Sequence, residues 1–290
     1  MENDQTNNLV TEHPRKMSKG IHGTSVHVFN IIRNSDGISR AELARTMGMS
    51  KSTISHHANI LLERGFIVEA GETASSGGRK AQLLKVNKRG GYILAVDLGA
   101  TSMNASICNL NAEPLVVESE DANVADGPEV VLERVVEVSK NLLKEANVSS
   151  AKLKGMGIGL PGPVELRTGL PIAPPIMPGW DRYPVKKFLE KQLGCPAYVD
   201  NDVNIMTLGE QWAGAGKEVP NFIFIKIGTG IGCGIVCQGE LYRGSMGCAG
   251  DIGHIRVDGA STICSCGNVG CLESVAGGKA ISVRAEQQAR

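Results

Sequence analysis

One histidine and three cysteines lie within eighteen positions near the end of the chain: His254, Cys264, Cys266 and Cys271. Zinc takes four nitrogen or sulfur ligands in a tetrahedron, and a Cys3His set can hold it in a closed, structural site. Gly267 and Gly270 would let the chain fold the last cysteine back toward the first two. The alternative is free buried thiols beside a core histidine, but so dense a Cys/His tract is typical of a metal site. We therefore expect structural Zn²⁺.

A second polar cluster is Tyr198-Val-Asp-Asn-Asp-Val-Asn204, where an expected strand runs into an expected helix over 204–212. Ligand crevices in α/β folds form at the carboxyl ends of strands. Asp202 is therefore a candidate base for a hydroxyl proton, and Asn201 a candidate hydrogen-bonding partner of that hydroxyl. The alternative is that these residues only cap the helix, because Asp and Asn both favour that position.

Two glycine-containing turns between expected strands form a third set. The first is Asp97-Leu-Gly99-Ala-Thr101, between strands over 92–98 and 102–110, and the second is Ile227-Gly-Thr-Gly-Ile-Gly232, between strands over 222–226 and 233–238. An Asp at a strand end followed by Gly and a hydroxyl residue can hold hydrated Mg²⁺ and let backbone amides approach phosphate. A plain strand turn is the alternative for each.

Together these segments resemble the ROK family (repressors, open reading frames and sugar kinases). Its hallmark is Glu-x-Gly-His followed by Cys-x-Cys-Gly-x-x-Gly-Cys-x-Glu, and this chain matches at Gly253, His254, Cys264, Cys266, Gly267, Gly270, Cys271 and Glu273. It departs at Asp251, where the family usually has Glu. The resemblance extends over roughly residues 90 to 290. It also includes Pro161-Gly-Pro-Val164, which follows an expected strand over 155–160 and is similar to the family's sugar-side loop. Helices are expected over 128–146 and over 274–290, the first with an apolar face made of Val131, Val135, Val138 and Leu142.

The resemblance implies an α/β, actin-like ATPase (ribonuclease H-like) sugar-kinase fold. It implies a sugar site made of Asn201, Asp202, Asp251, His254 and Glu273, with His254 shared between sugar and zinc. It implies a nucleotide site made of Asp97, Gly99, Thr101, Thr229 and Gly230. ROK kinases often have Lys after the threonine, whereas this chain has Ser102, which weighs against phosphate binding. Trp180 is expected either to stack on a sugar ring or to lie in the core.

The first ninety residues predict a different kind of domain. Ser39 and Glu42 form a capping box before a short helix that stops at Gly48, and Ser50 caps a second helix over 51–64. Two short helices joined by a Gly-containing turn are typical of a helix-turn-helix, and strands over 66–68 and 82–86 around a loop at 75–80 would add a wing. The predicted DNA contacts are Ser50, Lys51, Ser52, Thr53, Ser55, His56, Arg79 and Lys80. The alternative is a helical hairpin used for dimerisation or packing.

Charge and cysteine content agree with this division. Residues 1–90 hold 13 Lys and Arg against 8 Asp and Glu, and the rest of the chain holds 17 against 22. A basic head on an acidic body is typical of nucleic-acid binding. No apolar run approaches the length of a membrane span, and the polar start lacks the apolar core of a secretory signal. With eight cysteines, three of them in the metal cluster, we expect the reducing cytoplasm rather than a disulfide framework.

We therefore expect a flexible tail over 1–20, a winged helix-turn-helix over 21–88 and a ROK sugar-kinase-like domain over 89–290. That domain would be incomplete at its carboxyl end, because nothing here supplies the family's last glycine-rich strand end near the adenine. The favoured function is a homodimeric or higher-order, sugar-responsive regulator, most simply a repressor, that binds operator DNA and a sugar or sugar phosphate and is not an enzyme. The alternatives are an ATP-Mg²⁺-dependent hexose kinase with Asp202 as catalytic base, and a sugar-binding remnant without a role in gene control.

Overall fold

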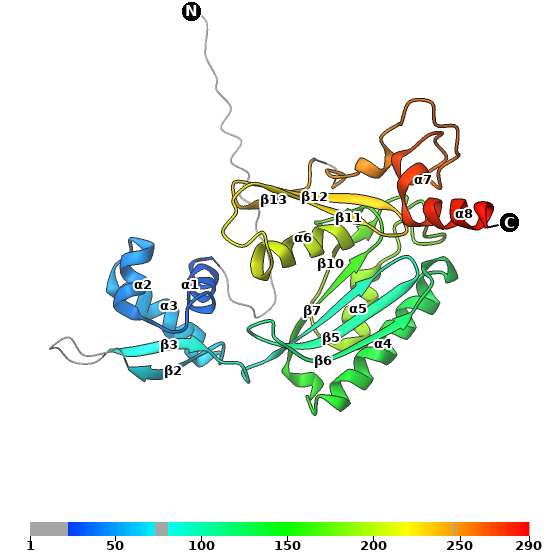
Figure 1. Ribbon diagram of the computed structural model, residues 1–290. Coiled ribbons are helices and arrows are strands. Elements are labelled where there is room, and N and C mark those ends of the chain that lie inside the picture. The colour runs from blue at the N-terminus through cyan, green and yellow to red at the C-terminus, as the bar shows by residue number, and fades with distance from the viewer. Residues whose placement is uncertain (1–22, 73–80, 246, 290) are drawn as a thin grey trace, which may run out of the picture. The chain divides into compact units, whose positions relative to one another are not determined.

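The computed structural model describes residues 23–72, 81–245 and 247–289 (Figure 1). The chain divides into two compact units, Met1–Asn87 and Lys88–Arg290. The expected tail over 1–20 and the whole of the expected wing loop at 75–80 therefore lie outside the described residues. No helix in the described residues is long and apolar enough to cross a membrane.

The first unit begins with three helices: α1 (Thr24–Arg33), α2 (Arg40–Met47) and α3 (Lys51–Glu63). The predicted capping box of α2 is confirmed, because Ser39 Oγ accepts from the Glu42 amide and the Glu42 carboxylate accepts from the Ser39 amide. Gly48 ends α2 in the left-handed conformation with φ of 62°, which glycine adopts without strain. The three helices share one core of aliphatic side chains: Val28, Ile32, Leu43, Ala44, Ile54, Ala58 and Leu61.

A three-stranded antiparallel sheet of order β1-β3-β2 completes this unit. Strands β2 (Ile67–Glu72) and β3 (Gln82–Val86) are the two predicted wing strands, although β2 runs four residues further than predicted. Strand β1 (Ile38–Ser39) was not predicted, because two residues are too few to show an alternating pattern. It pairs with β3 and ends at the N-cap of α2, so the sheet fixes where α2 begins.

The second unit is built on a mixed five-stranded sheet of order β10-β7-β4-β5-β6. The sequence predicted four of its strands: β4 (Tyr92–Leu98), β5 (Ser102–Asn109), β7 (Leu153–Leu160) and β10 (Ala197–Asn201). It missed the edge strand β6 (Pro114–Asp121). Strands β4, β5 and β6 form an antiparallel meander, whereas β7 lies parallel to both β4 and β10. The carboxyl ends of β4, β7 and β10 therefore meet at one edge of the sheet.

Helices α4 (Pro128–Glu145) and α5 (Val185–Leu193) pack against this sheet and close its main core. The predicted apolar face of α4 is confirmed, since Val131, Val135, Val138 and Leu142 are all buried. Trp180 is fully buried in the same core, and its Nε1 donates to the Val124 carbonyl at 2.9 Å. Of the two roles expected for Trp180, the structure supports the core aromatic and not the sugar-stacking one.

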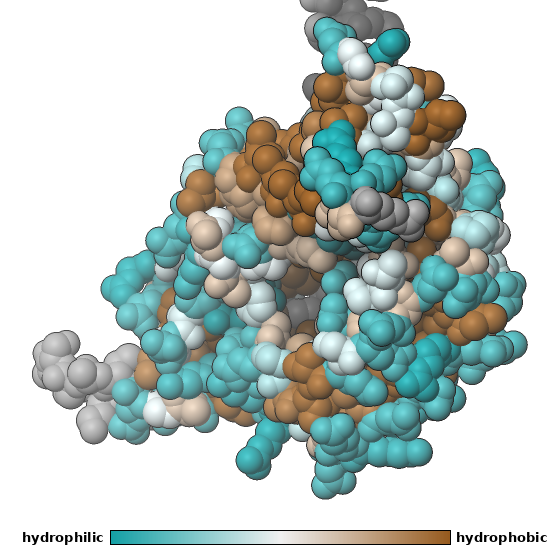
Figure 2. Space-filling model, turned by 45° about the vertical axis from the view of Figure 1, so that its right-hand side comes forward, coloured by the Kyte–Doolittle hydropathy of each residue, from teal (hydrophilic) through white to brown (hydrophobic). Residues whose placement is uncertain are grey.

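A second antiparallel sheet is formed by β11 (Phe222–Ile227), β12 (Ile231–Cys237) and β13 (Glu240–Tyr242). Helix α6 (Asp202–Ala213) contacts both sheets, and Gly234 of β12 lies so close to Thr207 of α6 that no side chain fits there. The alternate residues of β11, from Ile223 to Ile227, are 55–68% exposed. Figure 2 shows such apolar, brown surface among the teal polar surface.

Short segments complete the second unit: β8 (Val164–Glu165), β9 (Leu170–Pro171) and the 3-10 turns at Val124–Asp126, Ser150–Lys152 and Ile252–His254. The single helix predicted over 274–290 is wrong. The structure has α7 (Leu272–Ala276) and α8 (Gly278–Gln288), separated at Gly277. Helix α8 begins where the Gly278 amide donates to the Gly228 carbonyl at 2.7 Å, so contact with the second glycine turn ends α7 early.

Candidate functional site

A cleft of about 620 Å³ opens in the second unit where β4, β7 and β10 end and the β11–β12 turn approaches them. Nine of the predicted sugar and nucleotide residues line it: Gly99, Thr101, Asn201, Asp202, Thr229, Gly230, Asp251, His254 and Glu273. Asp97 and the buried thiols of Cys264 and Cys271 do not line it. The structure thus gathers residues that are far apart in sequence into one polar cleft.

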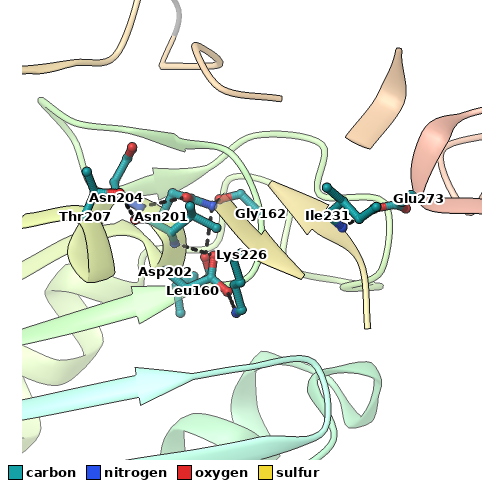
Figure 3. Close-up of polar contacts among 10 residues, drawn as sticks. Leu160, Gly162, Asn201, Asp202, Asn204, Thr207, Lys226, Ile231 and Glu273 are labelled. Atoms are coloured by element: carbon teal, nitrogen blue, oxygen red, sulfur yellow. Dashed lines mark hydrogen bonds and ion pairs between the residues drawn. The ribbon is translucent and has the colours of Figure 1, made fainter. Parts of the chain in front are cut away.

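Asn201 is both the N-cap of α6 and a brace for the proline-rich loop. Its Oδ1 accepts from the Asn204 amide at 3.2 Å, and its Nδ2 donates to the Gly162 carbonyl at 3.1 Å (Figure 3). The capping interpretation of the sequence is therefore confirmed for Asn201. The sugar-binding interpretation stays a prediction, since the residue also lines the cleft.

Asp202 is almost fully buried, and both of its carboxylate oxygens accept hydrogen bonds. Oδ1 accepts from the Val203 amide at 2.8 Å, and Oδ2 accepts from Lys226 Nζ at 2.6 Å. Figure 3 shows Lys226 and Asp202 pointing toward each other from β11 and the start of α6. Lys226 was not predicted from the sequence. The available signal was one cationic residue in an otherwise apolar strand, two positions before the turn Gly228-Thr-Gly230.

Asp97, at the end of β4, lies partly buried beside this pair. Burial raises the pKa of Asp97, the Lys226 ammonium lowers it, and the Asp202 carboxylate raises it further. Asn104, its neighbour across the β4–β5 ladder, donates a hydrogen bond to Asp97 and lowers its pKa. A carboxylate that is costly to ionise is typical of a functional cleft.

The two glycine turns are tight and lack bulky side chains. The Gly99 amide donates to the Ser102 carbonyl at 2.8 Å, and the Gly228 amide donates to the Gly230 carbonyl at 2.9 Å. A Cβ on Gly230 would lie 2.5 Å from Glu273 Oε2, so a larger residue there would displace that carboxylate. Both turns therefore expose backbone to the cleft, as a phosphate or a sugar hydroxyl would require.

The predicted metal ligands come together in space. The ligand atoms of His254, Cys264, Cys266 and Cys271 all lie within 4.8 Å of one another. His254 Nδ1 is 3.6 Å from Cys264 Sγ, and Cys266 Sγ is 3.7 Å from Cys271 Sγ. Ligands about 2.3 Å from a tetrahedral Zn²⁺ are separated by about 3.8 Å, so the donor set and its spacing fit a metal ion of this kind. Burial and the neighbouring thiols raise the pKa of Cys271 to about 12. A bound cation would have the opposite effect, because it stabilises the deprotonated thiolate that binds it.

Glu273 connects this cluster to the cleft. Its Oε1 accepts from Ser265 Oγ at 3.2 Å and lies 3.4 Å from Cys264 Sγ, while its Oε2 accepts from the Ile231 amide at 3.4 Å. On the other side, His254 turns Nδ1 toward Cys264 and Nε2 toward Asp251 Oδ1, at 3.8 Å. The cluster therefore positions two polar groups that line the cleft.

In the first unit, the predicted DNA contacts lie at the start of α3. Ser50 caps the helix, and its Oγ accepts from the Thr53 amide at 3.1 Å. Lys51, Ser52, Thr53 and His56 are exposed, whereas Ser55 is half-buried. Arg40, at the start of α2, pairs with Glu69 of β2 at 2.6 Å. Arg79 and Lys80 lie outside the described residues.

Comparison with known proteins gives two family matches. A model described as the ROK family matches residues 93–290, and a model described as the MarR family matches residues 19–79. The chain is 36% identical over 244 residues to a putative xylose repressor of Caldicellulosiruptor sp. (strain Rt8B.4), which covers 84% of this chain and 61% of that protein. The chain thus spans about three fifths of the length of the curated relatives that it matches.

Two solved structures are similar. One is a ROK family transcriptional regulator, a homologue of the Escherichia coli MLC protein, with a TM-score of 0.76 and 28% identity, covering 92% of this chain and 67% of that one. The other is a ROK family glucokinase from Streptomyces griseus in complex with glucose and AMPPNP, with a TM-score of 0.62 and 30% identity, covering 69% and 61%. The match to the regulator thus covers nearly the whole chain. The match to the kinase covers a stretch about as long as the second unit.

Proposed function

Because this chain belongs to the ROK family, we propose that it acts as a sugar-responsive transcriptional repressor. The first unit binds operator DNA through the exposed start of α3, and the cleft of the second unit binds a sugar that alters DNA affinity. The observation that supports this most is one chain carrying both a MarR-type winged helix and a polar ROK cleft. Relatives named xylose repressor support the same class of function.

Zinc is the proposed structural ion of the Cys3His cluster. It would be held by His254, Cys264, Cys266 and Cys271, and it would keep Glu273 and the second nitrogen of His254 aimed at the cleft. A metal clip of this kind preorders polar groups that would otherwise lose entropy when the sugar binds. The sugar contacts would come from Asn201, Asp202, Asp251, His254 and Glu273.

The protein would act as a homodimer, because a two-fold symmetric operator is bound by a two-fold symmetric protein. The cytoplasm is the compartment that we propose, since the eight cysteines, all of them in the described residues, form no disulfide. Operator contacts would come from Ser50, Lys51, Ser52, Thr53, Ser55 and His56, with Arg79 and Lys80 added from the wing.

Fluorescence anisotropy of the full chain on its own upstream DNA tests this function. We expect tight binding that weakens steeply with salt, a clear preference over random duplex, and release by one member of a panel of pentoses, hexoses and amino sugars. Lys51→Met should weaken binding to specific and random DNA alike and lower the salt slope by about one. Lys217→Met, at an exposed position in the second unit, is the control. No preference for upstream DNA would contradict the proposal.

The second candidate is an ATP-dependent hexose kinase, because Asp202 and both glycine turns line one cleft and a ROK glucokinase structure is similar. Asp202 would be the general base, with Asp97, Gly99, Thr101, Thr229 and Gly230 toward ATP-Mg²⁺. Sugar-dependent ADP release that disappears in Asp202→Asn would support this candidate. Absence of ADP release from the wild-type chain would exclude it.

A further inference from the structure

The cleft contains one lysine and an excess of carboxylates. Of the described residues that line it, Asp202, Asp251 and Glu273 carry carboxylates, and Lys226 is the one lysine or arginine. A phosphate group entering this cleft would meet three carboxylates. The position of the single ammonium therefore decides which ligands the cleft accepts.

The sheet brings Asp97 toward the same space as Asp202. Asp97 of β4 is the register partner of Gly159 on the parallel strand β7, so its side chain leaves the sheet on the face that a Gly159 side chain would use. A Cβ on Gly159 would lie 3.1 Å from Cα and 3.5 Å from Cβ of Asp202. The glycine therefore lets the start of α6, with Asp202, pack on the same face of the sheet as the Asp97 side chain.

Lys226 reaches this space from the second sheet. Its Nζ is 2.6 Å from Asp202 Oδ2, and its side chain is 28% exposed while that of Asp202 is 5% exposed. The Lys226 charge also acts on Asp97, since it lowers the pKa that burial raises. One ammonium thus pairs with the Asp202 carboxylate and also acts through its charge on the neighbouring Asp97.

In a phosphoryl-transfer site, a magnesium ion lies beside the carboxylates, where this chain has the Lys226 ammonium. There, Mg²⁺ is bound by one or two carboxylates and by substrate phosphates, because it keeps several waters and dehydrates reluctantly. An ammonium held by the Asp202 carboxylate repels a second cation over a few ångströms. Both oxygens of that carboxylate already accept a hydrogen bond, Oδ1 from the Val203 amide and Oδ2 from Lys226, so a metal ion would have to share each oxygen with a donor. The carboxylate pair of this chain therefore does not fit a magnesium ion.

We infer that Lys226 is a built-in counter-ion that takes the place of a divalent cation between Asp97 and Asp202. The cleft accordingly binds an uncharged sugar without a divalent cation, a nucleotide or a phosphate ester. This inference rests on the proposed sugar-binding role of the cleft and specifies its ligand class. Lys226 is a specificity-determining residue, and its replacement should open the cleft to divalent ions.

The test compares the wild-type chain with Lys226→Met, and with Lys217→Met as an exposed lysine control. Mn²⁺ binding is followed by electron paramagnetic resonance with and without AMPPNP. Sugar binding is followed by calorimetry with glucose, xylose and glucose 6-phosphate. We expect the wild type and the control to bind an uncharged sugar equally well with or without Mn²⁺ and AMPPNP, and to bind glucose 6-phosphate at least about tenfold more weakly than glucose. Lys226→Met should bind Mn²⁺ at least about tenfold more tightly than wild type.

A double variant tests whether the Mn²⁺ ion binds at the carboxylate pair. Adding Asp97→Asn to Lys226→Met should remove the Mn²⁺ affinity that Lys226→Met gains. A wild type that requires Mn²⁺ and AMPPNP to bind sugar, or that binds the phosphate ester as tightly as the sugar, would overturn the inference even if Lys226→Met failed to fold. A folded Lys226→Met that gains no Mn²⁺ affinity would also overturn it. Operator binding is measured on the same preparations to separate the repressor proposal from the inference about Lys226. A wild-type chain that does not bind operator DNA would count against the repressor proposal alone.

Discussion

At the scale of single residues, Glu273 links the Cys3His cluster to the cleft. It lies two positions after Cys271, and its two oxygens contact the thiol side and the glycine turn at Ile231 respectively. A small movement of the cysteine loop would therefore move a carboxylate that lines the cleft. Loss of the metal is expected to affect ligand binding through position, without removing any group that faces the ligand.

Cys271→Ser tests this link, because Cys271 is buried and does not line the cleft. Serine is a poor zinc ligand, so the variant should lose its bound zinc when measured by mass spectrometry. The melting temperature should fall by roughly 5–10 °C, as for the loss of a structural metal that costs about 2–3 kcal/mol. Cys237→Ser, at an exposed cysteine outside the cluster, should change neither quantity. Full zinc content in Cys271→Ser would contradict the assignment.

Arg243 also connects two distant segments, because its side chain joins the loop after β13 to the end of β10. Its guanidinium donates to Asp200 Oδ2 at 2.7 and 3.1 Å, and Asp200 Oδ1 accepts from the backbone amide of Asn201 and from the side-chain Nδ2 of Asn204. Arg243→Met would leave a mostly buried carboxylate without its charge partner, at a cost of about 2 kcal/mol. Arg167→Met, in an exposed ion pair, should cost less than about 0.5 kcal/mol. Urea unfolding followed by tryptophan fluorescence measures both, and equal losses would contradict the role of Arg243.

The site was only partly predictable from the sequence. The cysteine cluster and the Asn201-Asp202 pair were found because their residue types and short spacings carry the chemistry. Lys226 and Arg243 were not found, because each pairs with an aspartate 24 or 43 positions away. Such pairs depend on how β11 and β13 pack against α6, which no local pattern encodes.

At the scale of elements, the predictable parts were those with local signals. Caps, apolar periodicity and glycine stops correctly predicted α2, α3 and α4, and alternating or apolar runs predicted β4, β5 and β7. The strands β1 and β13 were missed because two or three residues show no period. The break between α7 and α8 was missed because a tertiary contact at Gly228 causes it.

The caps of α2 and α3 allow a prediction at this scale. Ser39→Ala removes a side-chain acceptor that satisfies the Glu42 amide, at a cost of about 1 kcal/mol. Hydrogen exchange of the α2 amides should then be about fivefold faster by mass spectrometry. Ser52→Ala, at an exposed position in α3, should leave exchange of α2 unchanged and lower DNA affinity. Unchanged exchange in Ser39→Ala would show that the sheet pairing of β1 alone holds the helix start.

At the scale of the whole molecule, charge divides along the same boundary as the fold. The unit Met1–Asn87 holds 11 Lys and Arg against 8 Asp and Glu, and the unit Lys88–Arg290 holds 19 against 22. In the proposed function, the basic unit would contact phosphate backbones and the acidic cleft would bind an uncharged sugar. A regulator needs a coupling free energy between two such sites, and coupling of this kind is reciprocal.

Reciprocity gives the last prediction. If the sugar weakens operator binding by some factor between about 5 and 150, operator DNA must weaken sugar binding by the same factor. Anisotropy titrations at saturating sugar and calorimetric sugar titrations at saturating DNA, in one buffer, measure the two factors independently. The mirror-image sugar is the control, because it changes the viscosity and the water activity of the buffer equally and should not fit the cleft. If the two factors differ by more than their errors, the sugar and the DNA do not bind to one and the same protein species, for example because the sugar changes the oligomeric state. Two factors of one would leave a chain that binds sugar and DNA without regulation.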